Sequence, residues 1–388
     1  MPSNKTLHRA KKQKNDEFYT QYADIEKEMN AYIEYNPDVF RNKVILLPCD
    51  DPEWSNFTKY FAQNFQRFGI KKLISTSYAI ESKPDDISYQ PTEFEKGSQK
   101  FDEIKTRKNG KIFILERDIN KDKEININDL EWDYLKGDGD FRSQEVTKLR
   151  DEADIIITNP PFSLFKEYLA WVNQKGKQYV MIGNLNAITY KEMFPLLMNN
   201  VLWMGATCFH GGAAYFIADS SLYEPEKMSN PKHAYMKDGK FYWRVNGIRW
   251  FTNIDHGRRH HPLPLMSMKD NERFSRHKEI KGKGYSHYDN YDAIEVPYAD
   301  SIPSDYTGIM GVPISFLDKY CPEQFKIVGM CENLDLYHLK TKVYSSEECH
   351  KRYYELFGKP GTYDLNASGV VNGIKVYQRI LIKHKEPQ

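Results

Sequence analysis

The sequence predicts an α/β fold, with an open sheet flanked by helices in residues 16–255 and an α+β region in residues 256–388. Three observations support this division. An apolar run at 43–49 leads into an acidic turn and an amphipathic helix, which is the order found in nucleotide-binding sheets. A second apolar run, at 155–157, stops at a loop that a helical pattern follows. After Asn253 the composition becomes basic and then rich in proline and tyrosine.

The composition limits the class of protein. The chain has 388 residues, a formal net charge of +1 and 40% hydrophobic residues, so it can form two folded domains but has no global positive field. Any nucleic-acid surface is therefore expected to be a local patch. No run reaches the roughly 18 apolar residues of a membrane span, and the first residues lack a signal-peptide pattern, so we expect a cytoplasmic protein. The five cysteines form no Cys-x-x-Cys pair, which favours reduced thiols and no metal site.

The first segment, residues 1–15, is basic and has no acidic residue. It is interpreted either as a solvated tail or as an arm along DNA phosphates. Phe18, Tyr19 and Thr20 follow, and after them apolar residues recur at helical spacing. Thr20 is the expected N-cap of that helix.

The next elements are a strand at 43–49 and a helix that Ser55 caps and Gly69 ends. The glycine-rich turn that usually joins such elements is missing. Asp50 and Asp51 stand in its place. We interpret them as acceptors for the ammonium or ribose hydroxyls of a bound cofactor, and the alternative is that they stabilise the helix N-terminus.

Short apolar runs at 73–76 and 112–115 predict two further strands, and the polar residues 82–110 predict a surface insertion. A glycine–aspartate run then ends in Asp140 and Phe141. This pair would suit the adenine of a cofactor, with the carboxylate accepting from the amino group and the ring stacking. An ordinary turn is an equally open interpretation, and Asp118 or Asp138 are alternative acids for the same contact.

The stretch 153–165, ADIIITNPPFSLF, contains the strongest functional signal. Methylation of an exocyclic amine on a nucleobase requires acceptors that hold the N–H groups and leave the nitrogen lone pair facing the methyl donor. The Asn159 side-chain oxygen and the Pro160 carbonyl can be these acceptors, because Pro160 and Pro161 restrict the backbone. Phe162 offers a face on which a flipped base stacks. The alternative is an ordinary Asn-Pro turn after a strand.

Later segments complete the predicted sheet. Asn246-Gly247 between two apolar runs predicts a β-hairpin at the sheet edge. The remaining strands are expected at 178–183, 201–204, 213–217, 241–245 and 248–252.

The block 256–287 has eight Lys or Arg residues against three Asp or Glu. Arg258, Arg259 and His260 are our candidates for contact with DNA phosphates. His256 and His260 stand at a spacing that can ligate a metal, but no cysteine or carboxylate neighbours support this, and we expect no metal.

The chain resembles the EcoRI-type adenine-specific DNA methyltransferase family over nearly its whole length. The motifs that carry the resemblance are DEFYTQYADIE, CDDPEWSNF, GDGDFRS with ADIIITNPPFSLFKEY, WFTNID, and YDNYDAIEV with GIMGVPISFLDKY. Many adenine methyltransferases have Phe-Tyr-Thr-Pro lining the cofactor pocket, and Phe18, Tyr19 and Thr20 resemble it, with Gln21 where proline is usual.

The resemblance implies a Rossmann-like methyltransferase sheet with a C-terminal target-recognition region. It also implies transfer of the methyl group of S-adenosyl-L-methionine to N6 of adenine in double-stranded DNA by base flipping. A monomeric modification enzyme of a restriction-modification or phage system is expected, with a cognate endonuclease that acts on the same site without direct contact. Two alternative functions fit the same sequence: a glutamine or RNA N-methyltransferase that uses the same loop, and a DNA-binding protein without catalytic activity.

Overall fold

The computed structural model describes residues 20–50, 55–79, 97–209, 213–218, 234–237, 240–361 and 369–385. The chain divides into two compact units. The first comprises the described residues of Met1–Met193 and Leu202–Gly257, and the second those of Phe194–Val201 and Arg258–Gln388.

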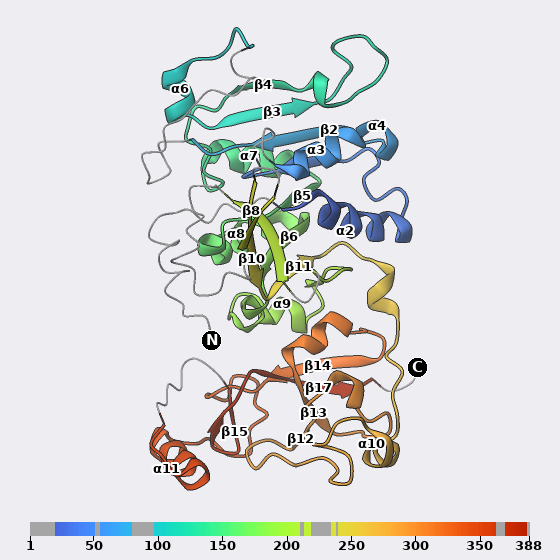
Figure 1. Cartoon of the computed structure of the whole chain (residues 1–388), viewed down its shortest axis with the longest axis vertical. Coiled ribbons are helices and arrows are strands. Elements are labelled where there is room, and N and C mark those ends of the chain that lie inside the picture. The colour runs from blue at the N-terminus through green and yellow to red at the C-terminus, as the bar shows by residue number, and fades with distance from the viewer. Residues whose placement is uncertain are drawn as a thin grey trace. The chain divides into compact units, whose positions relative to one another are not determined.

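The first unit contains a mixed sheet that has eight strands among the described residues, in the order β4-β3-β2-β1-β5-β6-β11-β7 (Figure 1). The central strands β2, β1, β5 and β6 are parallel, and β3, β4, β11 and β7 join them by antiparallel pairing. The strands are β1 (Val44–Leu47), β2 (Lys72–Thr76), β3 (Lys111–Leu115), β4 (Glu131–Tyr134), β5 (Ile155–Thr158), β6 (Gln178–Asn184), β7 (Trp203–Met204) and β11 (Ile248–Thr252).

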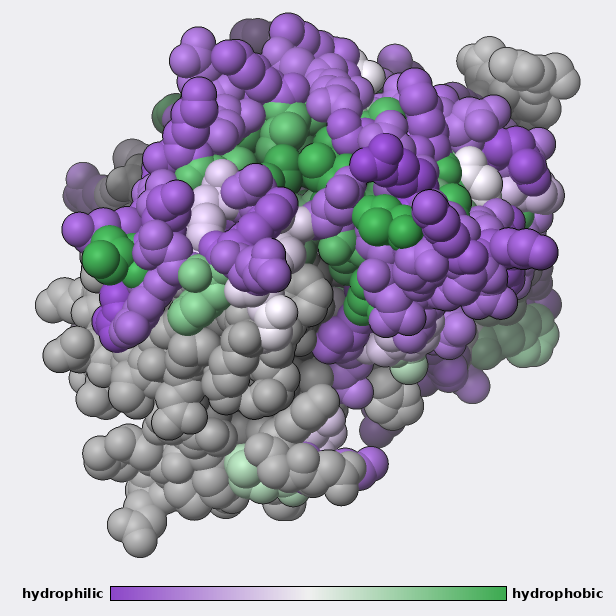
Figure 2. Space-filling view, turned by 90° about the horizontal axis from the view of Figure 1, so that it is seen from above, coloured by the Kyte–Doolittle hydropathy of each residue, from purple (hydrophilic) through white to green (hydrophobic). Residues whose placement is uncertain are grey.

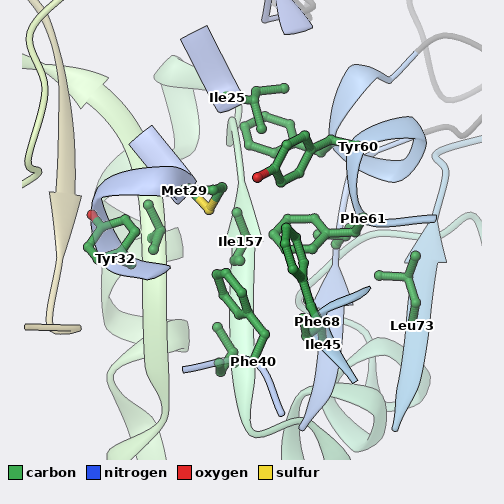
Figure 3. Packing of buried hydrophobic residues seen from close by; sticks show 14 of the residues in the cluster. Ile25, Met29, Tyr32, Phe40, Ile45, Tyr60, Phe61, Phe68, Leu73 and Ile157 are labelled. Atoms are coloured by element: carbon green, nitrogen blue, oxygen red, sulfur yellow. The ribbon is translucent and has the colours of Figure 1, made fainter. Parts of the chain in front are cut away.

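Three helices cover one face of this sheet: α2 (Tyr22–Tyr35), α3 (Asn56–Gln63) and α4 (Phe65–Phe68). Their apolar side chains recur every three or four residues and therefore share one side of each helix. Figure 3 shows how Ile25, Met29, Tyr60, Phe61 and Phe68 from these helices point toward Ile45, Leu73 and Ile157 of the strands. Ser55 caps α3 by accepting from Phe57 N, and Gly69 ends α4 with a φ of 64°, as the sequence predicts. The single helix predicted between them is instead divided at Asn64 into α3 and α4.

The alternate residues of the central strands, such as Leu46 and Ile156, point to the opposite face of the sheet. Two further helices are α7 (Gln144–Glu152) and α8 (Phe165–Val172). Phe165 of α8 lies against Gly183, which follows the core residue Ile182 in β6 and therefore faces that opposite side. The two helices are joined by Trp171 Nε1, which donates to Thr147 Oγ1 at 3.1 Å. Another helix, α6 (Glu103–Lys108), lies within the predicted insertion. On the face that Figure 2 shows, hydrophilic residues cover most of the described surface.

The predicted hairpin around Asn246-Gly247 is wrong. The strand before it, β10 (Lys240–Asn246), pairs with β8 (Ala213–Ala218) and β9 (Ala234–Lys237) in a separate sheet. The strand after it, β11, pairs with β6 and β7 in the main sheet. All five residues of β11 are buried, so it belongs in the interior of a large sheet, and Gly247, with a φ of 74°, lets the chain turn from one sheet to the other.

Other predictions differ in detail. Gln21, not Thr20, is the N-cap of α2, and no side chain caps that helix. The strand expected at 201–204 is confined to Trp203–Met204. No apolar pattern in the sequence predicts β4 or α7, because charged residues interrupt both segments. The strands at 43–49, 73–76, 112–115, 155–157 and 178–183 are confirmed.

The second unit has a sheet of order β12-β13-β17-β14. Its apolar core includes Tyr288, Tyr291, Cys331 and Leu381. Its elements are α9 (Phe194–Met198), α10 (Met268–Phe274), β12 (Ala293–Glu295), β13 (Ile309–Pro313), β14 (Phe325–Met330), α11 (Ser346–Phe357), β15 (Val370–Val371), β16 (Ile374–Lys375) and β17 (Arg379–His384). Among the residues described in both units, no helix is long and apolar enough to cross a membrane.

Candidate active site

The loops with the strongest sequence signals lie at one edge of the main sheet. Because β1, β2, β5 and β6 are parallel, their carboxyl ends share that edge. From β1 the chain continues to β2 on one side, whereas β5 continues to β6 on the other. The position between β1 and β5 is therefore a topological switch point, where open α/β sheets bind their ligands.

The Asn-Pro-Pro-Phe loop begins directly after β5. Thr158, the last residue of the strand, is fully buried, Asn159 is half-buried and Pro160 is buried. Phe162 starts a 3-10 turn (Phe162–Leu164) that leads into α8, and its ring packs partly buried against the core below α2 and α3. The loop is thus held by a buried strand on one side and a packed helix on the other, and the two prolines restrict its backbone.

The turn after β1 is the neighbour of this loop. Cys49 has a φ of 68°, a left-handed conformation that costs a residue other than glycine about 1–2 kcal/mol. Cys49 therefore makes the sharp turn for which nucleotide-binding folds commonly use glycine. The turn brings Asp50 back toward the sheet, where its backbone N–H donates to Thr76 O at 2.9 Å.

Asp50 is 5% exposed, and its carboxylate lies within a hydrogen-bond network. Its Oδ1 accepts from Ser55 Oγ at 2.9 Å, and its Oδ2 accepts from Thr158 Oγ1 at 2.7 Å. Asp50 therefore connects the first turn of α3 to the start of the Asn-Pro-Pro-Phe loop. Its predicted partner Asp51 lies outside the described residues.

The loop 137–141 lies beside the carboxyl end of β2. Asp138 O accepts from Ala79 N at 2.7 Å. Gly139 has a φ of 86°, and a Cβ built on it would lie 2.2 Å from Ser77 O, so only glycine fits there. The structure thus brings this loop to the same edge as the turn after β1 and the loop after β5.

Within this loop, the two predicted adenine contacts have internal partners. Asp140 forms an ion pair with Arg142 at 2.5 Å. The ring of Phe141 is 2% exposed and lies edge-on to Tyr168 and Trp171, with centroid distances of 5.2 and 5.5 Å. Both roles toward the cofactor stay predictions, and the arrangement shows that Phe141 already packs in the core.

The two alternative acids have local contacts. Asp118 accepts from the backbone N–H groups of Lys121 and Lys123. Asp138 Oδ1 accepts from Asp140 N at 3.1 Å. Asp118 thus stabilises its own turn, whereas Asp138 lies in the loop beside β2.

Tyr168, on α8, is a residue that the sequence analysis assigned only to a helix face. Its hydroxyl is buried and has no hydrogen-bond partner within the described part of the chain. Burial, with smaller contributions from the nearby Cys49 and Asp50, raises the pKa of Tyr168 well above its ordinary value. The hydroxyl is therefore a neutral polar group near the turn after β1.

Two buried hydroxyls fit a polar ligand at this edge. Thr20 Oγ1 and Thr76 Oγ1 are shielded from solvent and have no hydrogen-bond partner among the residues that the structure describes. Thr76 is the last residue of β2, and the carbonyl of Thr20 accepts from Asn56 Nδ2 at 2.7 Å, at the first turn of α3. A buried hydroxyl without a partner is costly, so a ribose or an amino acid group that bonds to it would be favoured. Phe18 and Tyr19 lie outside the described residues.

The predicted phosphate contacts belong to the second unit and differ in exposure. Arg258 is exposed. Arg259 is 8% exposed, and its guanidinium donates to the Asn200 side-chain oxygen. His260 Nδ1 lies 2.9 Å from Glu323 Oε1. Of the three, Arg258 has the exposure that a DNA contact needs. No group of His, Cys, Asp and Glu suited to a metal ion occurs in the described ranges of the chain.

Comparison with known proteins gives consistent matches. The family model "Adenine-specific methyltransferase EcoRI" matches residues 6–385. The type II methyltransferase M.EcoRI of Escherichia coli is 40% identical over 334 residues, covering 86% of this chain and 91% of the relative. M.MpnI of Mycoplasma pneumoniae is 33% identical, covering 87% and 90%, and M.MgeORF184P of Mycoplasma genitalium is 32% identical, covering 98% and 99%. No solved structure matches the chain.

Proposed function

The chain belongs to the EcoRI family of adenine-specific methyltransferases, and from this we propose that methyl transfer takes place at the carboxyl edge of its main sheet, between β1 and β5. The protein is an adenine-specific DNA methyltransferase, and its methyl donor is S-adenosyl-L-methionine. We further propose roles for individual residues, a base-flipping step and a biological setting.

The observation that carries the proposal is the position of the Asn-Pro-Pro-Phe loop. It starts at the switch point of the sheet, and a hydrogen bond between Thr158 and Asp50 joins it to the turn after β1. The sheet order, with antiparallel β11 between β6 and β7, supports a Rossmann-like methyltransferase fold. Ligands at such a site bind beside the carboxyl ends of the strands.

In the proposed reaction the target adenine leaves the DNA stack and its N6 amino group enters this loop. The Asn159 side-chain oxygen and the Pro160 carbonyl accept the two N–H groups, which directs the nitrogen lone pair toward the methyl donor. Phe162 stacks on the extruded base, a contact of about 1–3 kcal/mol. The prolines hold the two acceptors in place before the base arrives.

The cofactor supplies an electrophilic methyl group, and residues at the same edge would hold it. We propose that Thr20 and Thr76 bind its polar groups, because their hydroxyls are buried without partners in the described chain. Asp50 and Asp140 are proposed to contact its ammonium, ribose or adenine, and Phe18, Tyr19, Asp51 and Phe141 complete the predicted set.

The second unit is proposed to read the target sequence in double-stranded DNA, with Arg258 on a phosphate. The relatives are named type II methyltransferases. We propose that this chain likewise acts as a cytoplasmic, monomeric modification enzyme, whose cognate endonuclease recognises the same site without contacting it.

The test is to express the chain in a host without adenine methylation and to sequence modified bases in the host DNA. We expect N6-methyladenine at one short recurrent sequence, and none with Asn159→Ala. Purified protein should transfer labelled methyl groups to duplex DNA containing that sequence. Transfer to RNA or to a glutamine peptide in preference to DNA would overturn the proposal, and so would DNA without modified adenine.

A further inference from the structure

Thr158 is the polar exception in an otherwise apolar strand. The other residues of β5 are Ile155, Ile156 and Ile157, and all four side chains are 0–1% exposed. A hydroxyl at such a position costs stability unless it is hydrogen-bonded, and valine would fill the same volume without a polar group. A reason for the hydroxyl is therefore to be sought in what it contacts.

The Thr158 hydroxyl has one hydrogen, and it shares this hydrogen between two acceptors in the turn after β1. Oγ1 is 2.5 Å from Pro48 O and 2.7 Å from Asp50 Oδ2. Asp50 is itself held from three directions, because Ser55 Oγ, Ser75 Oγ and Thr58 Oγ1 donate to its carboxylate or carbonyl oxygens. The hydroxyl thus attaches the end of β5 to a rigid group of atoms.

The attachment point is the residue that directly precedes Asn159. The backbone pairing of β5 with β1 includes Ile155 and Ile156, and no pair beyond them is formed. Beyond Ile156 the backbones of β5 and β1 no longer pair. The hydrogen bond from the Thr158 side chain therefore connects the two strands at this point. Rotation or displacement of Thr158 would move both Asn159 and Pro160.

We propose that Thr158 is a positioning residue for methyl transfer, which sets the orientation of Asn159 and Pro160 through its hydrogen bonds to Pro48 and Asp50. The inference rests on the proposed function of the Asn-Pro-Pro-Phe loop. Thr158 touches neither the base nor the cofactor. Its effect is on the rate of transfer, because a displacement of reacting groups by about 1 Å can reduce a rate by about 100-fold.

The experiment compares Thr158→Val, which removes the hydroxyl at nearly constant volume, with Thr158→Ser, which retains it. Single-turnover methyl transfer is measured at saturating DNA and S-adenosyl-L-methionine, and both dissociation constants are measured by titration. We expect Thr158→Val to be about 10- to 100-fold slower. The dissociation constant for DNA should stay within about 3-fold of wild type, and Thr158→Ser should recover most of the rate. Saturating S-adenosyl-L-methionine keeps any weaker cofactor binding that results from the lost contact to Asp50 out of the measured rate.

Thr252 provides a matched control in the same sheet. It is also fully buried at the end of a strand, and its Oγ1 donates to Tyr179 O at 2.8 Å. It pairs with Val180 in the first half of β6, away from the carboxyl edge. Thr252→Val should lower the unfolding temperature about as much as Thr158→Val does, while its transfer rate stays near wild type.

Several results would overturn the inference. They are a wild-type rate in Thr158→Val, a Thr158→Ser variant as slow as the valine variant, or equal slowing by Thr252→Val. Should Thr158→Val not fold, Thr158→Cys repeats the test, because a thiol of similar size is only a weak donor. A wild-type protein that transfers no methyl group to adenine would overturn the proposed function as well, whereas normal wild-type transfer with a fast Thr158→Val overturns the inference alone.

Discussion

Replacement of Asn159 by alanine separates the chemistry from the fold and from binding. The side chain is half-buried and begins a loop, so the backbone pairing of β5 with β1 and β6 does not depend on it. The bonds from Thr158 to Pro48 and Asp50 also remain. We therefore expect the free energy of unfolding to change by less than about 1 kcal/mol.

The transfer rate should fall far more. Of the two proposed acceptors for the adenine amino group, the Pro160 carbonyl survives the substitution and the Asn159 amide oxygen is lost. Loss of one preorganised polar group typically costs about 2.7–4 kcal/mol of transition-state stabilisation, or about 10²- to 10³-fold in rate. Affinities for DNA and cofactor should stay close to wild type, because the contacts that provide them lie elsewhere.

The assay is single-turnover transfer of a labelled methyl group, with Asn253→Ala as the matched control. Asn253 Oδ1 accepts from Tyr179 N, and its Nδ2 donates to Lys177 O, both at 2.8 Å, near the start of β6. That variant should unfold at a lower temperature and retain the wild-type rate at a permissive temperature. An Asn159→Ala protein that methylates DNA at nearly the wild-type rate would refute the mechanism, even though the family would stand.

Three further predictions concern other parts of the chain. Phe162→Ala should bind DNA normally but extrude less of a fluorescent base analogue placed at the target, because the stacking face is lost. Arg258→Ala should reduce the slope of log affinity against log salt by about one, whereas Arg259→Ala, whose guanidinium bonds to Asn200, should mainly lower stability. Burial raises the pKa of Glu28 above its usual 4.5. The contribution of Glu28 to folding stability is therefore fully present below pH 4.5, and it is lost as the pH rises through the pKa of the folded state. Glu28→Gln should flatten the dependence of the unfolding temperature on pH over that window.

Patterns confined to neighbouring residues determined much of the fold. Apolar runs predicted the central strands, because a strand buried on both faces leaves no room for polar side chains. Ser55 and Gly69 predicted the two ends of a helical segment, because each acts on backbone groups within its own turn. The sequence likewise predicted a loop with a restricted backbone at Asn-Pro-Pro-Phe, since proline fixes its own φ and restricts the residue before it wherever it occurs.

Contacts between distant residues were decided only by the tertiary structure. The bond from Thr158 to Asp50 joins residues 108 positions apart, and nothing near either residue in the sequence specifies the other. Arg258 and Arg259 are adjacent in the sequence but differ in exposure. The guanidinium of Arg259 is buried and donates to Asn200, which is 59 positions away.

The strands on either side of Gly247 illustrate the same limit. A short turn between two apolar runs predicts a hairpin, but whether neighbouring strands pair depends on which other edges compete for them. Here β6 and β7 take both edges of β11, and β8 and β9 take both edges of β10. The sequence alone determined where strands and turns occur, because local sterics and burial set them, whereas strand partners and the surroundings of each site residue follow from packing across the whole chain.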